Sequence, residues 1–214
     1  MRLRITFSKS GALRYIGHLD LHSLWERTVR RAGLPLAYTQ GFHPSPKIQL
    51  ASALPLGFIG CAEIVDLWIN DPADSLNPVY KELLQSASPL GLVISTVEVV
   101  DEHAPALQTR VVSADYEVTL LESEFASDLK SSIAVVLAAA SLPRERRGKT
   151  YDLRSLVESL ELAPGEGSLP PRLHMRLAAR EGATGRPEEV LDALGIPLET
   201  TRIERTRLIL QDIK

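Results

Sequence analysis

Cysteine is almost absent from this 214-residue sequence, which contains only Cys61. One thiol cannot form an internal disulfide or supply the three thiolates of a radical-type iron–sulfur cluster. Long apolar runs are also missing: none reaches the roughly 18–20 residues that cross a bilayer, and the N-terminus lacks a signal peptide's apolar block. We therefore expect a cytoplasmic protein without membrane contact or a cofactor of its own. Any radical chemistry must come from a partner.

The motifs of common enzyme classes are missing as well. There is no catalytic serine elbow, no GxGxxG and no metal-binding carboxylate cluster. The loop Ser8-Lys-Ser-Gly11 lacks the spacing of a phosphate-binding P-loop. His18 and His22 lie four residues apart on a predicted helix, but a zinc site needs further nitrogen or sulfur ligands. The sequence therefore predicts no metal site and favours a non-catalytic role.

What is present is an ordinary globular composition with an uneven charge. Apolar residues make up 44% of the chain and charged residues 24%, with a formal net charge of −3. Residues 1–47 hold eight Lys/Arg against two acids, a net +6, whereas residues 48–142 hold three against thirteen, a net −10. A local positive excess of this kind indicates a phosphate-bearing partner even when the whole chain is acidic.

Hydrophobic periodicity predicts the order β-α-β-β-α-β in the first half. Alternation predicts strands and apolar residues at helical spacing predict helices, whereas three prolines with a glycine predict a long ordered loop or a broken extended segment. The helix near residue 80 is expected to start after Asp74 as its N-cap. The expected elements are a strand at 2–8, a helix at 17–32, a loop at 34–47, strands at 48–54 and 62–69, a helix at 75–86 and a strand at 92–100.

A similar order returns after a polar, proline-containing linker at 101–112. The expected elements are a strand at 116–121, a helix at 123–140, one interrupted strand at 150–162, a strand at 172–178, a helix at 187–194 and a strand at 200–210. The sequence therefore predicts an α+β fold of two tandem ferredoxin-like halves with antiparallel sheets, at residues 1–100 and 113–214.

The basic helix and the loop that follows it are the candidate binding residues. Cations interleaved with aromatic rings are what single-stranded RNA binds. We expect phosphate contacts from Lys9, Arg14, Arg27, Arg30, Arg31 and Lys47, base stacking on Tyr38 and Phe42, and hydrogen bonds from His18, Asp20, Gln40 and His43. Two structural interpretations compete with this one. The arginines also suit the C-terminal end of a helix dipole, and Phe42 suits a core plug that anchors the loop.

Five motifs in the first 57 residues resemble a known family. They are Arg2-Leu-Arg-Ile-Thr-Phe-Ser-Lys-Ser-Gly11, Leu13-Arg-Tyr-Ile-Gly-His-Leu-Asp20, Arg30-Arg-Ala-Gly-Leu-Pro-Leu-Ala-Tyr38, Gly41-Phe-His-Pro-Ser-Pro-Lys-Ile48 and Ala53-Leu-Pro-Leu-Gly57. They resemble the bacterial radical SAM-linked proteins, a domain of unknown function found beside, or fused to, cobalamin-binding-type radical SAM proteins. Weaker likeness continues through Tyr151-Asp-Leu-Arg154 and residues 186–195. The resemblance implies a radical SAM partner protein encoded nearby but no particular reaction.

We therefore expect a non-catalytic accessory protein that binds RNA or another phosphate-bearing substrate and presents it to a radical SAM enzyme. Two alternatives remain open. The chain itself could be a metal-independent endoribonuclease of the tandem ferredoxin-like type, using His18 or His43. It could instead be a protein-binding scaffold whose acidic middle segment docks a basic partner.

Overall fold

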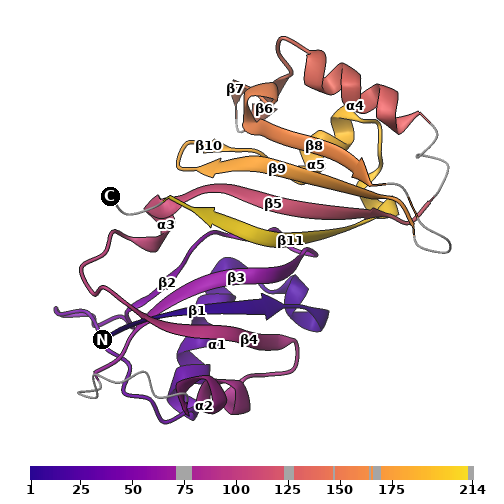
Figure 1. Cartoon of the computed structure of the whole chain (residues 1–214). Helices are drawn as coiled ribbons and strands as arrows, with labels where there is room; N and C mark the ends of the chain where they lie inside the picture. The colour runs from indigo at the N-terminus through magenta and orange to yellow at the C-terminus, as the bar shows by residue number, and fades with distance from the viewer. Residues whose placement is uncertain (71–78, 123–127, 147, 164, 166–169, 212–214) are drawn as a thin grey trace. The chain divides into compact units, whose positions relative to one another are not determined.

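The computed structural model describes the chain except for residues 71–78, 123–127, 147, 164, 166–169 and 212–214. The chain divides into two compact units, one made of Met1–Val111 together with Gln211 and the other of Val112–Leu210. Helices and mainly antiparallel strands make up both units (Figure 1). The predicted α+β class with antiparallel sheets is therefore confirmed. No helix in the described ranges is long and apolar enough to cross a membrane.

The first unit contains a four-stranded antiparallel sheet with strand order β4-β1-β3-β2. Its elements are β1 (Arg2–Lys9), a 3₁₀ turn η1 (Gly11–Tyr15), α1 (His18–Arg31), β2 (Ile48–Leu50), β3 (Ile59–Trp68), α2 (Val79–Ala87), β4 (Leu92–Val100) and the short α3 (Leu107–Arg110). The expected β-α-β-β-α-β order is present. The predicted N-cap Asp74 and the predicted first turn of α2 lie outside the described residues.

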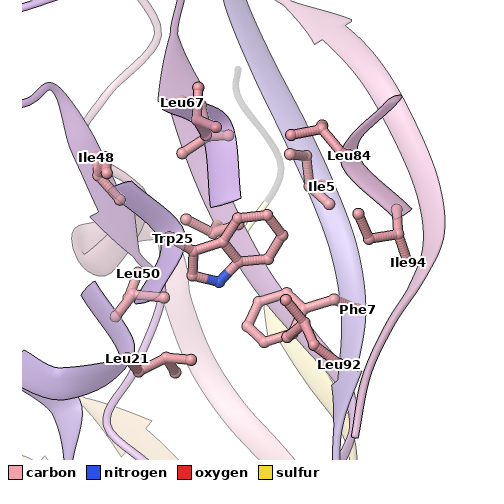
Figure 2. Packing of buried hydrophobic residues seen from close by; sticks show 12 residues of the cluster. Ile5, Phe7, Leu21, Trp25, Ile48, Leu50, Leu67, Leu84, Leu92 and Ile94 are labelled. Atoms are coloured by element: carbon pink, nitrogen blue, oxygen red, sulfur yellow. The ribbon is translucent and has the colours of Figure 1, made fainter. Parts of the chain in front are cut away.

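Trp25 lies at the centre of the core that joins α1 to this sheet. Its indole is fully buried and meets the Phe7 ring edge to face, with centroids 5.0 Å apart and an interplanar angle of 74°. Figure 2 shows it surrounded by side chains from β1, β2, β3, α2 and β4. Leu21 and Val29 flank Trp25 at spacings of four along α1. These three residues form the centre of the apolar stripe that the periodicity predicts, with Thr28 buried beside them, so the charged side chains of α1 lie on its other faces.

The opposite face of β1 and β3 carries a buried cluster of charges. Both Arg2 and Arg4 form ion pairs with Asp66, at 2.6 and 2.8 Å, and the Asp66 carboxylate is completely buried. The Arg2 guanidinium also donates to the carbonyls of Ala104 and Pro105. It therefore ties the chain that follows β4 to the first strand. Two of the eight basic residues in the opening segment are thus neutralised internally.

The second unit has a sheet with strand order β11-β5-β9-β8, and the short β10 pairs with a further part of β9. Its elements are β5 (Val111–Leu120), α4 (Leu129–Ala138), β6 (Pro143–Arg146), β7 (Lys149–Asp152), η3 (Arg154–Leu156), β8 (Val157–Ala163), β9 (Arg172–Arg180), β10 (Ala183–Thr184), α5 (Pro187–Ala193), η4 (Leu198–Thr200) and β11 (Thr201–Leu210). The predicted interrupted strand at 150–162 is β7, a 3₁₀ turn and β8. The pairing of β7 with β6 as a separate hairpin was not predicted.

Asp115 connects three strands of the second sheet. From β5 it accepts hydrogen bonds from Arg176 on β9, at 2.7 and 3.1 Å, and from Arg207 on β11, at 3.0 Å. Burial alone raises the pKa of Asp115, but the hydrogen bonds from the two guanidinium groups outweigh it and hold the pKa below its ordinary value. The ionised carboxylate therefore stabilises the folded sheet.

Replacing Asp66 with asparagine should destabilise the protein strongly. The D66N variant keeps the size of the side chain but leaves the buried Arg2 guanidinium without its counter-charge, and breaking a buried pair costs about 3–5 kcal/mol. Urea unfolding of the full chain measures this loss. Glu199→Gln, at an exposed position of η4 in the second unit, is the control, expected to change stability by less than about 0.5 kcal/mol. Equal stability of D66N and E199Q would contradict this account.

Replacing Asp115 with asparagine should destabilise the protein in a pH-dependent way. At pH 7 we expect a loss of about 1.5–3 kcal/mol, since the hydrogen bonds that disappear involve charged groups. The folded-state pKa is lowered, so the stabilisation is complete above the unfolded-state pKa of about 3.9 and disappears as the pH falls through the folded-state value. Urea midpoints between pH 7 and pH 2.5 should therefore converge for wild type and D115N. A difference in urea midpoint that stays constant with pH would show that ionisation of Asp115 does not contribute to stability.

Candidate nucleic-acid interface

Residues 37–47 form a loop that backbone hydrogen bonds close at its base. The Lys47 amide donates to the Ala37 carbonyl at 2.8 Å, and the Thr39 amide donates to the Ser45 carbonyl at 2.9 Å. The Thr39 hydroxyl accepts from the Ser45 amide, also at 2.9 Å. An isolated bridge between Tyr38 and Pro46 lies at the same level. The segment is thus an ordered, hairpin-like loop, which is one of the two forms that its prolines and glycine predict.

The tip of this loop, residues 40–44, is exposed to solvent. Phe42 has a relative exposure of 103%, so its whole ring is available for contact. The core-plug interpretation of Phe42 is therefore wrong. Gln40 and His43 flank it and are also exposed. Three of the predicted binding residues are thus brought together at one place.

Arg30 links the basic helix to the base of the loop. Its guanidinium pairs with Glu26 one turn earlier on α1, at 2.7 Å. A hydrogen bond with the Tyr38 side chain, and then the charge of Glu26, raise the pKa of Arg30 above its ordinary value. Tyr38 is thus held beside the cationic flank of α1.

A cavity of about 340 Å³ lies at the base of the loop. Its lining consists of Thr39, Pro46, Lys47, Ile48, Gln49 and Trp68. Trp68 comes from β3, and the Arg2 guanidinium stacks over its ring at 4.6 Å from the centroid. Trp68 was not among the predicted binding residues. The sequence does contain one indication of its position, because Trp68 follows Asp66 by two residues and therefore lies on the polar side of an alternating strand.

Arg27 and Arg31 line a second cavity, of about 300 Å³, on another side of α1. Ile16, Asp20, Leu24, Thr28 and Pro89 complete its lining. Pro89 follows α2, so this cavity lies between α1 and the segment after α2, whereas Arg30 meets the loop. The three arginines that the sequence places on one polar face therefore serve two separate flanks of the helix.

Four predicted contacts lie at the start of α1 or before it. Lys9 has a relative exposure of 1%, so it cannot contact phosphate at the surface, and its ammonium lies 3.4 Å from the Ile16 carbonyl. The Arg14 guanidinium donates to the Tyr15 hydroxyl, and the Asp20 carboxylate accepts from the Gly17 amide at the helix start. His18 is exposed. The residues expected to bind RNA therefore do not share one surface. They divide into a separate helix flank with Arg27 and Arg31 and a loop-centred cluster of Arg30, Tyr38, Gln40, Phe42, His43 and Lys47.

The second unit carries its own cavity, of about 570 Å³, between the β6–β7 hairpin and the β9–β10 turn. Arg146 lies in its wall and pairs with Glu189 at 2.7 Å while donating to the Tyr151 hydroxyl at 3.1 Å. Burial, followed by hydrogen bonding to Glu189, raises the pKa of Tyr151. Arg146 Nε and Glu189 Oε2 are nevertheless buried without a hydrogen-bond partner among the described residues. Within the described ranges, no group of three or more His, Cys, Asp or Glu residues is arranged to hold a metal ion.

Comparison with known proteins gives one family match. No curated protein matches the sequence. Residues 2–187, most of the chain and all of the loop-centred cluster, match the family described as "Uncharacterized protein conserved in bacteria". The chain therefore belongs to this bacterial family, DUF2344.

Proposed function

We propose that this protein is a non-catalytic accessory protein that binds single-stranded RNA through the loop surface, defined as Arg30, Tyr38, Gln40, Phe42, His43 and Lys47. The observation that carries the proposal is the complete exposure of Phe42 at the tip of an ordered loop. An exposed phenylalanine does not contribute the roughly 1.5–3 kcal/mol of stability that burial of its side chain would give. Single-stranded RNA binds to surfaces on which aromatic rings stack on the bases and cations contact the phosphates.

The charges around the loop suit a phosphate backbone. Arg30 and Lys47 are both exposed, and they come from the helix before the loop and from the base of the loop. Two acids reduce the local field: Glu26 pairs with Arg30, and the pKa of Glu102 is lowered mainly by a hydrogen bond from the N-terminal ammonium, with a smaller contribution from Lys47. The small positive charge that remains supports weak RNA binding that decreases as salt rises. Base stacking then contributes a large part of the binding free energy.

The cavity next to Trp68 supports a second nucleotide contact. Lys47 and Thr39 lie in its lining, so a cation and a hydroxyl are available for a phosphate or a ribose. Its volume of about 340 Å³ falls within the range of small-ligand pockets. A base stacked on Phe42 and its neighbour in this cavity would follow the loop from tip to base.

The proposed architecture is two ferredoxin-like units in tandem. In the first unit the strand order is β4-β1-β3-β2. The second unit has the equivalent order β11-β5-β9-β8, with its fourth, first, third and second strands in these positions, when the β6–β7 hairpin is treated as an insertion. Fold alone carries no function, so this likeness adds nothing to the RNA proposal.

The proposed partner is a radical SAM protein encoded nearby. It rests on the resemblance of the N-terminal motifs and on the single Cys61, which excludes a three-cysteine cluster in this chain. In this role the loop surface holds the RNA, or another phosphate-bearing substrate, while the partner performs the chemistry.

Replacing Phe42 with leucine should weaken RNA binding, because leucine keeps the apolar surface but cannot stack on a base. Stacking contributes about 1–3 kcal/mol per base, so we expect a roughly 5- to 150-fold loss for F42L and near wild-type affinity for F42W. Fluorescence anisotropy with a labelled single-stranded RNA measures both. Val135→Ala, a change at an exposed apolar residue of α4, is the matched control. Equal affinity of F42L and wild type overturns the proposal. RNA cleavage in the presence of a chelator would favour the ribonuclease alternative instead.

Replacing Arg30 and Lys47 together with alanine should flatten the salt dependence of RNA binding. Removing one cation from a phosphate changes the slope of log K against log salt by about 0.7 on a single strand, so the R30A/K47A variant should differ from wild type by about 1.4. Titrations between 50 and 300 mM KCl give the slope. Lys81→Ala with Lys130→Ala removes two exposed lysines elsewhere and should leave it unchanged. An unchanged slope in R30A/K47A would remove these two cations from the interface.

A further inference from the structure

The cavity beside Arg27 and Arg31 is a groove that the RNA proposal does not use. We call it the docking groove and define it by its lining residues Ile16, Asp20, Leu24, Arg27, Thr28, Arg31 and Pro89. Ile16 and Leu24 pack against the core around Trp25, so the floor of the groove is held in place. The Thr28 hydroxyl donates to the Leu24 carbonyl, and Ile16, Leu24 and Pro89 supply the apolar part of a lining that is otherwise polar.

Three large exposed apolar side chains are direct chain neighbours of residues that line the docking groove. Leu90 is 98% exposed, Leu19 80% and Tyr15 64%, and each is the direct chain neighbour of a lining residue, namely Pro89, Asp20 and Ile16. Single exposed apolar residues are normal on a protein surface, but several around one groove indicate a binding surface for another protein.

The charges of the groove differ between its ends. Asp20 lies in the first turn of α1, whereas Arg27 and Arg31 lie in its second half, so the groove is acidic at one end and basic at the other. From Asp20 to Arg31 the helix rises roughly 16 Å, about three helical turns. An occupant of matching length is a helix of about ten residues with acidic side chains near Arg27 and Arg31.

We propose that the docking groove binds a short amphipathic helix of a partner protein, whose apolar side chains repeat at i, i+3/i+4 and i+7 and whose Asp or Glu residues pair with Arg27 and Arg31. Helix-in-groove recognition combines apolar anchors of this spacing with charged flanks that set direction. A phosphate backbone fits the groove less well, since Asp20 opposes it and Ile16, Leu24 and Pro89 make part of the lining apolar. The proposal is independent of RNA binding by the loop surface.

Site-specific photo-crosslinking tests the docking groove. The full chain carrying benzoylphenylalanine at position 90 is produced in the bacterium that makes it, irradiated and treated with nuclease, and the crosslinked peptide is sequenced by mass spectrometry. We expect one protein adduct whose crosslinked segment has the stated apolar spacing and acidic residues. Benzoylphenylalanine at position 135 on α4, an exposed apolar position of the second unit, should give no such adduct.

Charge reversal gives the second arm of the test. Arg27→Glu with Arg31→Glu should reduce the adduct at least tenfold, whereas Lys81→Glu with Lys130→Glu, which reverses two exposed lysines elsewhere, should not. Lysine substitutions at the acidic residues of the identified segment should then restore the adduct with the R27E/R31E variant. Thermal unfolding of each variant shows that it is folded. The milder Leu90→Ser change, with the crosslinker moved to position 15, should also reduce the adduct.

Several results would overturn the proposal. They are the absence of an adduct, an adduct with a second copy of this chain, a crosslinked segment without acidic residues or apolar spacing, an adduct removed by nuclease, and an adduct that charge reversal leaves unchanged. The Phe42→Leu variant separates this proposal from the proposed function, because it should lose RNA affinity and keep the adduct. Either proposal can therefore fail while the other holds.

Discussion

The burial of Trp25 against Phe7 sets the rotation of α1 on its sheet, and the positions of the other surface groups follow from it. The indole is surrounded by residues of four strands and α2, so α1 cannot turn without opening a large cavity. With Leu21, Trp25 and Val29 facing inward, Arg30 lies beside the loop and Arg27 and Arg31 lie beside the segment after α2. One packing contact thus divides a single basic helix between two surfaces.

The loop surface and the docking groove use the same helix for different chemistry. At the loop, an exposed aromatic ring and two exposed cations are the groups that we propose to bind bases and phosphates. At the groove, the apolar lining residues Ile16, Leu24 and Pro89 lie with Asp20 at one end and Arg27 and Arg31 at the other. A protein with both could hold a substrate on one flank of α1 and a partner enzyme on the other, which is the arrangement an accessory role needs.

Charge counted along the chain overstates the charge at the surface. Of the eight basic residues in the first 47, Lys9 is buried, and Arg2 and Arg4 pair with Asp66 from the acidic middle segment. Lys9 occupies the same strand phase as Leu3, Ile5 and Phe7, so its inward direction could have been predicted from alternation if the first strand had been extended by one residue. Asp66 could not have been identified as the counter-ion, because it lies far from Arg4 along the chain and only strand pairing brings the two together.

The amino-acid sequence by itself determined the α+β class, the order of strands and helices in the first unit and the inward face of α1, because these follow from local periodicity and from the glycine and proline residues that end each element. Only the tertiary structure decided that Phe42 is exposed, that Trp68 lies beside the loop and that Pro89 meets Arg27 and Arg31 across a groove. These placements join segments that are distant in the chain. Such contacts depend on the register of strand pairing and the rotation of a packed helix, which no local pattern encodes.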